Sequence, residues 1–563
     1  LMNVFDQFVS RFLNEYNRFH PVNATLLGHH DFNTQLDDLS TRAIEIQRAW
    51  LESARQELAA IPIESLEIHR QVDHTILSNK IFARQLDLDV LRVWRRDPCF
   101  YNDLATRSIH GLITRPYAPL DERAHAFIAR LRQIPALLNL GRQHLEAELS
   151  DPPALPLHAS GLQPLVGIPH SFVEAALTEF DGGLWFFEHD VTRVLDNVSD
   201  SQLRRQGYDA NDQVVDLYRD LLTWLETSVR PRSSGSFALG RDVFAAKLRA
   251  EEHITTSVEE IVAVATEKLR QTQARMHELV ARIGSCETVW ECVKHLSERD
   301  QPTVHDVLPA YAHELGAARQ FILDQKLVDV PPGELRMEEM PPFLRDITIA
   351  AIERTGPFEK AELPSFFFVT LPDPKACSNE QAEMLRAHSR LMRQTTIVHE
   401  AYPGHFIQGL HWALTPSAVR KSFSSMTFVE GWAHYCEQMM AEQGFWDDDP
   451  QLFLFQEFDS LLRIGRVIVA TRMHTEGMTV AEAEAFLQTE VWQEPVLARM
   501  EAHRYMRDPF VLVYSWGKWQ FQSLLEEFRR QQGSNFSLGD FHNQVLAHGE
   551  PPVELLRRLI LET

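Results

Sequence analysis

The sequence has few cysteines, and their placement excludes two classes of protein. Only five occur in 563 residues, an odd number without CxxC spacing: Cys99, Cys286, Cys292, Cys377 and Cys436. A disulfide framework needs paired cysteines, usually in a short secreted chain, and cysteine-ligated zinc sites need closely spaced pairs. Neither pattern is present, so we expect reduced and mostly buried thiols.

Basic residues and long apolar runs are also scarce. The chain carries 55 Lys and Arg against 79 Asp and Glu, a formal net charge of −24 with His neutral. Phosphate backbones and anionic lipids select basic surfaces, so neither nucleic acid nor a membrane is an expected partner. No apolar run approaches the roughly 18 residues of a membrane-spanning helix, and no signal peptide is recognisable at the start. The sequence therefore predicts a cytoplasmic protein.

Helical periodicity, by contrast, runs through most of the chain. From Ser257 to Ile283 the apolar residues recur every three or four positions, which predicts a long amphipathic helix. Short strands are expected at Phe366–Thr370 and near Leu335–Met340. The predicted fold class is mostly α with one small β-sheet. Similar patterns predict helices over 2–19, 40–60, 64–89, 121–149, 211–229, 305–325, 378–399, 451–474, 479–489 and 515–532.

The breaks between these helices are rich in proline and glycine, and the stretch 230–240 (RPRSSGSFALG) is the best candidate for a boundary. We expect residues 1–240 to form an N-terminal helical scaffold and residues 241–563 to form a helical region that carries the chemistry. Because no long flexible linker separates them, a single continuous domain is the alternative.

One motif has the residue types of a metal site. His399-Glu400 is followed by His405, and helical zinc sites use two imidazoles to hold the metal beside a carboxylate that activates water. The usual spacing of the histidines is four, whereas six places them about 240° apart on a regular helix. Pro403 and Gly404 lie between them, and both residue types disrupt helices. A shared metal therefore requires a break at this point; otherwise the two histidines are ordinary polar positions.

A third ligand is expected from another helix. Glu430 and Glu437 in the segment FVEGWAHYCE are seven residues apart, so they share one helix face. Glu430 is the candidate ligand, and Glu437 is the candidate to hydrogen-bond a ligand imidazole. His434 is the nearby residue that could supply a fourth ligand and so close a structural site; the alternative is an interior histidine.

These motifs resemble those of the bacterial family called domain of unknown function 885 (DUF885), which carries HExxPGH in place of HExxH. That family is grouped with the zincin-type metallopeptidases and is similar in fold to carboxypeptidase Taq-type enzymes. The resemblance implies a zincin-like helical metallopeptidase fold, with a deep cleft and one small sheet near the metal site. It rests on HEAYPGH at 399–405, Gln408, EGWA at 430–433 and Glu437, and on His20-Pro21, Thr25, Gly28, Arg130-Leu131, Pro135, Arg504-Tyr505, Pro509, Tyr514 and Gly517.

The resemblance also implies roles for individual residues. His399, His405 and Glu430 would bind one zinc ion per chain, although imidazole and carboxylate ligands also suit manganese, iron and cobalt. Glu400 would be the general base, which takes a proton from the attacking water and passes it to the leaving amine.

Further residues are candidates for contacting a substrate. Tyr514 is the candidate donor to the oxyanion, with a buried core tyrosine as the alternative. Arg504 could bind a substrate carboxylate, which favours carboxypeptidase action, or form a structural salt bridge. The strand Phe366–Thr370 could pair with an extended peptide or lie wholly in the core. His503, like His434, is expected in the interior.

The sequence thus predicts a zinc-dependent metallopeptidase that hydrolyses short peptides and could be carboxypeptidase-like. One alternative keeps the metal but changes the substrate to an amide or ester of a small metabolite. The other alternative is a non-catalytic helical scaffold whose motif is a structural or relic metal site. Exo- or endopeptidase action, side-chain preference and the formation of a homodimer are left open.

Overall fold

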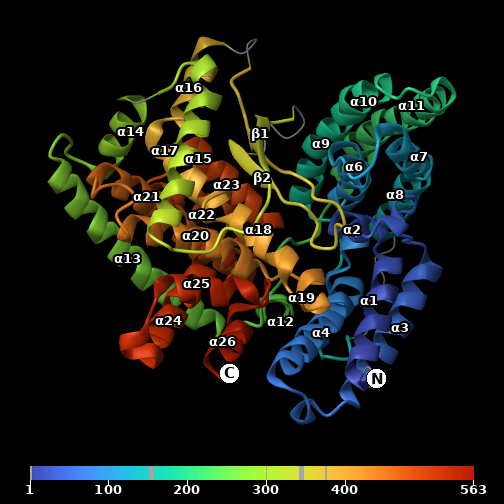
Figure 1. Cartoon of the computed structure of the whole chain (residues 1–563). Helices are drawn as coiled ribbons and strands as arrows, with labels where there is room; N and C mark the ends of the chain where they lie inside the picture. The colour runs from blue at the N-terminus through green and yellow to red at the C-terminus, as the bar shows by residue number, and fades with distance from the viewer. Residues whose placement is uncertain (1–2, 151–156, 300, 342–347, 374–376, 563) are drawn as a thin grey trace. The chain divides into compact units, whose positions relative to one another are not determined.

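The fold is mostly helical, with one small sheet, as predicted. The computed structural model describes residues 3–150, 157–299, 301–341, 348–373 and 377–562, which form two compact units (Figure 1). The first unit comprises Leu1–Glu251 and Phe358–Leu363, and the second comprises Glu252–Pro357 and Pro364–Thr563. The boundary expected near residue 240, between a helical scaffold and the region that carries the chemistry, stays a prediction.

The first unit is assembled from helices. Its α-helices are α1 (Val4–Phe19), α2 (Pro21–Leu27), α3 (Thr41–Ala59), α4 (Ile68–Leu86), α5 (Val93–Arg96), α6 (Cys99–Thr114), α7 (Leu120–Leu131), α8 (Ile134–Ser150), α9 (His170–Trp185), α10 (Thr192–Asp196), α11 (Ser201–Trp224) and nearly all of α12 (Arg241–Glu252). Short 3-10 and π turns extend several of them, including η3 (Asp87–Leu91), η4 (Phe186–Val191) and η5 (Leu225–Val229).

One segment of the first unit is distant from the rest of it in sequence. Phe358–Leu363 belongs to this unit although the chain on both sides of it belongs to the second. The backbone N–H of Phe358 donates to the carbonyl of Leu27 at 3.0 Å. His30 Nε2 lies 2.8 Å from Glu359 Oε2, and the Glu359 side chain is 5% exposed. The segment is therefore held by both backbone and side-chain contacts.

The second unit holds the longest helices and the sheet. The buried apolar side chains of its main core come from several helices and from β3 (Ser365–Val369), and they include Phe367, Trp432 and Phe521. Its other helices are α13 (Val258–Ile283), α14 (Val289–Arg299), α15 (Val307–Asp324), α16 (Ser378–Ala387), α17 (Arg390–Glu400), α18 (His405–Leu414), α19 (Ala418–Ser422), α20 (Met426–Glu442), α21 (Pro450–Thr475), α22 (Val480–Thr489), α23 (Pro495–Arg507), α24 (Val513–Gln532), α25 (Leu538–Ala547) and α26 (Val553–Leu561).

The sheet has three strands in the order β1-β3-β2, where β1 is Leu335–Glu339 and β2 is Ala350–Glu353. β3 pairs with β1 in parallel and with β2 antiparallel. Both faces of β3 are buried. The expectation that this strand could pair with a peptide is therefore wrong, because its two edges already carry hydrogen bonds to neighbouring strands.

The helix predictions succeed where apolar periodicity is uninterrupted and fail where a new helix starts without a change of period. The helix expected from Ser257 to Ile283 is α13. The single helix expected over 121–149 is two helices, since Pro135 lacks the N–H that would continue the first one. The single helix expected over 378–399 is also two, because Ser389 has an extended backbone (φ −55°, ψ 155°).

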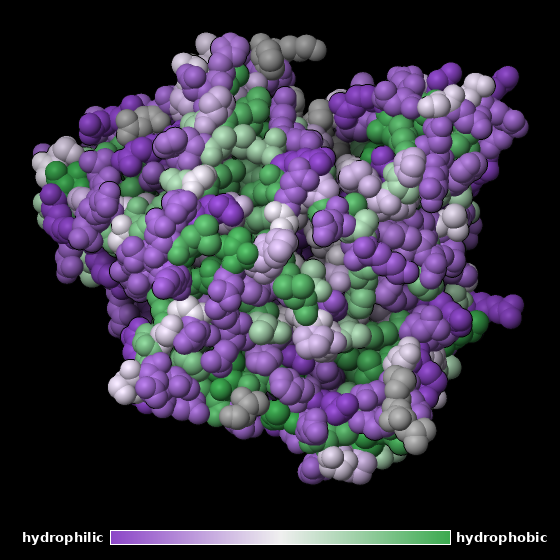
Figure 2. Space-filling view, viewed as in Figure 1, coloured by the Kyte–Doolittle hydropathy of each residue, from purple (hydrophilic) through white to green (hydrophobic). Residues whose placement is uncertain are grey.

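One face of the molecule shows how polar and apolar side chains are distributed over its surface. Figure 2 shows one face, on which hydrophilic side chains predominate and apolar side chains form small scattered groups. None of the described helices is long and apolar enough to cross a membrane.

Helices α20 and α24 approach each other closely where Gly431 faces Gly517. A Cβ atom on Gly517 would lie 2.0 Å from the carbonyl oxygen of Thr427, and one on Gly431 would lie 2.5 Å from the Cα of Gly517. A methyl group cannot fit at either position without movement of the backbone. The two glycines therefore fix the separation of the helices that carry Glu430 and Tyr514.

We expect Gly517→Ala to lower the free energy of unfolding by about 1–3 kcal/mol, because the added methyl group forces the two helices apart. Gly316→Ala is the matched control. Gly316 also lies inside a helix of the second unit, but a Cβ there meets nothing within 4 Å. The control should be neutral or stabilising by up to about 1 kcal/mol, since alanine favours helix more than glycine does. Thermal unfolding of both variants decides the matter, and equal melting temperatures would contradict the close-contact argument.

Candidate metal centre

The chain breaks its helix between the two histidines of the motif. α17 ends at Glu400 and α18 begins at His405, and the Tyr402–Pro403 peptide bond in between is cis. A Cβ atom on Gly404 would lie only 1.7 Å from the carbonyl oxygen of His399, so this close approach admits only glycine. As a result the rings of His399 and His405 meet nearly at right angles, with centroids 4.9 Å apart.

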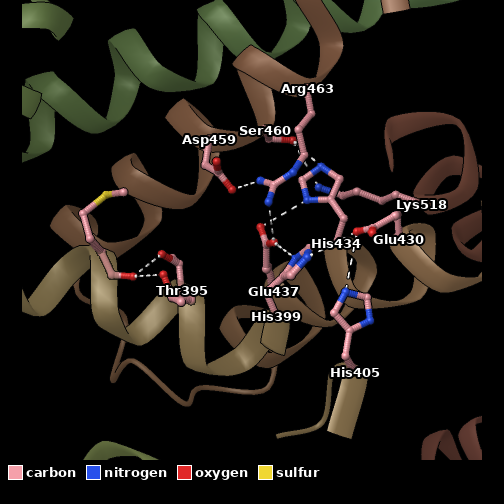
Figure 3. A network of polar contacts seen from close by, with 12 residues as sticks. Thr395, His399, His405, Glu430, His434, Glu437, Asp459, Ser460, Arg463 and Lys518 are labelled. Carbon is pink, nitrogen blue, oxygen red and sulfur yellow. Dashed lines mark hydrogen bonds and ion pairs between the residues drawn. The ribbon is translucent and has the colours of Figure 1, made fainter. Parts of the chain in front are cut away.

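Glu430 completes a group of three potential ligands. Its Oε2 lies 3.5 Å from His399 Nε2 and 3.6 Å from His405 Nε2, and the three atoms lie within 4.8 Å of one another (Figure 3). Ligand atoms about 2.0–2.2 Å from a tetrahedral zinc ion are separated by about 3.3–3.6 Å. The two distances from Glu430 therefore fit a bound zinc ion. No further His, Cys, Asp or Glu of the described chain joins this group.

Hydrogen bonds orient both imidazole rings toward the shared space. His399 Nδ1 lies 2.7 Å from Glu437 Oε1, and His405 Nδ1 lies 3.0 Å from Gln408 Oε1. That Gln408 oxygen also accepts from Arg354 Nη1 at 3.3 Å, which identifies it as an acceptor. Both Nδ1 atoms must then carry hydrogen, so Nε2 is the nitrogen through which each ring would bind a metal, which would displace any proton there.

The two carboxylates on one face of α20 bracket the His399 ring. Glu430 lies at Nε2 and Glu437 at Nδ1, as their seven-residue spacing predicted. Burial lowers the pKa of His399, but hydrogen bonds to these two carboxylates outweigh it and raise the pKa to about 9. Burial acts to raise the pKa of Glu430, yet its contacts with His399 and His405 hold the pKa well below its usual value. The site therefore favours a positive charge, such as a divalent cation supplies.

The N-terminus of α20 is held by a buried carboxylate. Glu252 accepts hydrogen bonds from the backbone N–H groups of Met426 and Thr427, at 3.0 and 2.9 Å, and from the Ser425 and Thr427 hydroxyls. Burial raises the pKa of Glu252, against the effect of these donors. The carboxylate satisfies helix-end donors that would otherwise lack partners, one turn before Glu430.

Glu400 lies between the ligand group and the sheet. Its carboxylate accepts a hydrogen bond from the backbone N–H of Ile352 in β2. Burial raises the pKa of Glu400, while the nearby His399 and His405 act in the opposite direction. β2 is an outer strand of the described sheet, so Glu400 lies at the sheet edge.

Tyr514 stands in the first turn of α24 and is half-buried. The negative charge of Glu430, followed by burial, raises the pKa of the phenol to about 12. The guanidinium groups of Arg463 and Arg466 lie over its ring, at 5.7 and 5.3 Å from the centroid. The phenol thus stays protonated near neutral pH and lies within electrostatic reach of a candidate ligand.

Arg504 and His503 are less closely involved. Arg504 is exposed and forms an ion pair with Asp508 at 3.5 Å, which is the structural alternative expected for it. Its positive charge still lowers the pKa of Tyr514 slightly, against Glu430. His503 is exposed, so the expectation of an interior histidine is wrong; it lies on the outer face of α23.

Several polar residues around the site belong to no recognisable sequence motif, so the sequence did not predict them. Arg463 and Ser460 in α21 and Lys518 in α24 surround His434 and Glu437 (Figure 3). The one available sequence signal was Lys518, a lysine set among Trp516, Trp519 and Phe521 in a helix, where a solvent-exposed lysine is not expected.

Comparison with known proteins gives a family and a fold. The family model described as "Bacterial protein of unknown function (DUF885)" matches residues 21–560. A "putative lipoprotein of unknown function" from Shewanella oneidensis has a similar solved structure, with a TM-score of 0.79, 21% identity and complete coverage of both chains. A "putative lipoprotein" from Colwellia psychrerythraea is also similar, with a TM-score of 0.80, 17% identity and coverage of 100% of this chain and 99% of that one. A search of curated proteins found no match.

Proposed function

The chain belongs to the DUF885 family of bacterial proteins, and from its candidate metal centre we propose that it is a zinc-dependent metallopeptidase acting on short peptides. The observation that carries the proposal is the convergence of His399, His405 and Glu430 with Glu400 beside them. Three protein ligands leave one position for water or substrate, as in catalytic rather than structural zinc sites. A bound zinc ion would polarise the substrate carbonyl and make water acidic at neutral pH.

The chain's own residues supply the proton transfers. Glu400 takes the proton of the attacking water and passes it to the leaving amine. Its pKa, raised by burial, brings the carboxylate nearer to the working pH, where a general base is most effective. Tyr514, protonated at neutral pH, donates to the developing oxyanion.

The sheet edge supports a peptide as the substrate. β2 is an outer strand, and the backbone N–H of Ile352 is directed at Glu400. An extended peptide that pairs with this edge would place a backbone carbonyl near the general base. We therefore propose that the peptide pairs with β2, and not with β3 as the sequence had suggested. The fold proposed around it is a zincin-like arrangement of helices, cleft and sheet.

Two further parts of the proposal concern specificity and the competing functions. A carboxypeptidase-like activity requires Arg504 to exchange Asp508 for the substrate's terminal carboxylate, and the exposure of Arg504 permits this exchange.

A closed structural site would need His434 as a ligand. Both ring nitrogens of His434 instead face Glu437 and Ser460, which supports an open, catalytic site.

The proposal is tested with zinc-reconstituted protein and a panel of di- to pentapeptides, each with free or blocked termini. N-acyl amides and esters of small acids complete the panel, and products are identified by mass spectrometry. We expect cleavage of free peptides, with loss of activity on amidation of the C-terminus if Arg504 binds that carboxylate. Cleavage of the acyl compounds alone would favour the small-metabolite hydrolase, and no cleavage of any compound would favour the scaffold.

A further inference from the structure

A second polar cluster adjoins the ligand group and is made of His434, Glu437 and Asp459. Their potential ligand atoms also lie within 4.8 Å of one another, so a second metal ion must be considered. Arg463, however, pairs with both carboxylates: it contacts Asp459 and lies 3.4 Å from Glu437 Oε1 (Figure 3). Lys518 adds another buried positive charge nearby. Arg463 already balances the charge of both carboxylates and would repel a metal ion, so this cluster has a different role.

His434 and Glu437 of this cluster belong to a chain of hydrogen bonds that begins at Lys518 and ends at His399, a candidate ligand. Lys518 Nζ lies 3.2 Å from Ser460 Oγ, and that oxygen lies 3.3 Å from His434 Nε2. His434 Nδ1 lies 3.1 Å from Glu437 Oε2, and Glu437 Oε1 lies 2.7 Å from His399 Nδ1. Every member of the chain is buried.

The chemistry of the carboxylate and of the ammonium group fixes the donor and the acceptor at each step, and the donors from both ends of the chain converge on Glu437. An ammonium can only donate, so Lys518 donates to Ser460, whose hydroxyl then donates to His434 Nε2. A carboxylate can only accept, so His434 donates from Nδ1 to Glu437 Oε2. The same carboxylate accepts from His399 Nδ1 at Oε1, so Nε2 is the ring nitrogen that His399 presents to the metal.

Glu437 needs a donor at each oxygen to keep its orientation. Both His399 and Arg463 lie at Oε1, so they share one oxygen. His434 is the contact at the other oxygen, Oε2. Without it, a buried oxygen loses its donor, and the carboxylate is free to rotate so that Oε2 turns toward Arg463 and Oε1 turns away from His399.

We propose that His434 is a positioning residue of the metal centre, which holds Glu437 in the orientation that directs His399 Nε2 at the metal. The inference rests on the proposed metal centre and extends it to a residue that does not touch the metal. Loss of the direct hydrogen-bond partner of a ligating histidine typically weakens metal binding about 10–100-fold, and here that partner is Glu437, through which His434 acts.

The test measures cobalt binding to the metal-stripped full-length protein, by competition with a chelator and by the visible absorption of bound Co²⁺. We expect His434→Leu to weaken Co²⁺ binding by about 10–100-fold and to change the absorption spectrum. His434→Asn keeps an N–H near the position of Nδ1, so it should restore most of the affinity. His144→Leu is the matched control: His144 is also buried and hydrogen-bonded, but it belongs to the first unit.

The outcomes separate this inference from the proposed function. If wild type binds cobalt and His434→Leu binds it with equal affinity and spectrum, the positioning role is wrong while the metal centre stands. If the wild-type protein binds no cobalt, the metal centre is wrong and the inference falls with it. An equal loss in His144→Leu would show general destabilisation and would overturn the inference. Should His434→Leu not fold, Ser460→Ala takes its place, with a smaller loss of affinity expected because His434 Nε2 loses its donor.

Discussion

Glu400→Gln is expected to bind zinc as well as wild type does and to lose about 10²–10⁴-fold in turnover of a cleaved peptide. The amide occupies the same volume and can still accept the hydrogen bond from Ile352, but it cannot take a proton from water. Glu400 is not a member of the ligand group, so its replacement should leave the metal in place.

The measurement pairs kcat with zinc content determined by mass spectrometry on the same sample. Glu442→Gln is a suitable control, since Glu442 is an exposed glutamate on α20 that bonds Gln438. Its activity should be unchanged. Full turnover by zinc-loaded Glu400→Gln would refute the general-base role and leave the metal centre untouched.

His405→Ala should lose the metal altogether. Wild type is expected to retain about one zinc ion per chain after dialysis, because three ligands hold it, whereas two remain in the variant. The removed imidazole is also the ring that Gln408 orients, so Gln408 would have no ligand left to position.

His411→Ala provides the comparison for this prediction. His411 lies on the same helix, six residues further along, and its Nε2 lies 2.9 Å from the carbonyl oxygen of Asp329. It should keep its zinc. Retention of zinc by His405→Ala would mean that His405 is not an essential ligand, and the six-residue spacing would then have no role in metal binding.

The ligand group could be anticipated because its determinants are local. Pro403 and Gly404 between two histidines indicate a break in the helix. Residue 404 must be glycine because a Cβ atom there would lie 1.7 Å from the carbonyl oxygen of His399. The seven-residue spacing of Glu430 and Glu437 likewise follows from helix geometry alone. The sequence therefore predicted which side chains would meet at His399.

The surroundings of the group could not be anticipated, because long-range packing determines them. β2 has only four residues and no alternation, and its place beside β3 depends on pairing across the sheet. Ser460 contacts His434 and Lys518 contacts Ser460, both from other helices, and neither residue belongs to a local motif. Burial, which decides the pKa of Glu400, is likewise a property of the packed unit.

The membership of Phe358–Leu363 in the first unit has a consequence for biosynthesis. A ribosome releases the chain from its N-terminus, and domains commonly fold as they emerge. Here Leu27 and His30 acquire their contacts with Phe358 and Glu359 only after the chain has passed through β1 and β2. The first unit to be translated is therefore completed late, and a fragment that stops at Glu251 lacks a part of its own unit.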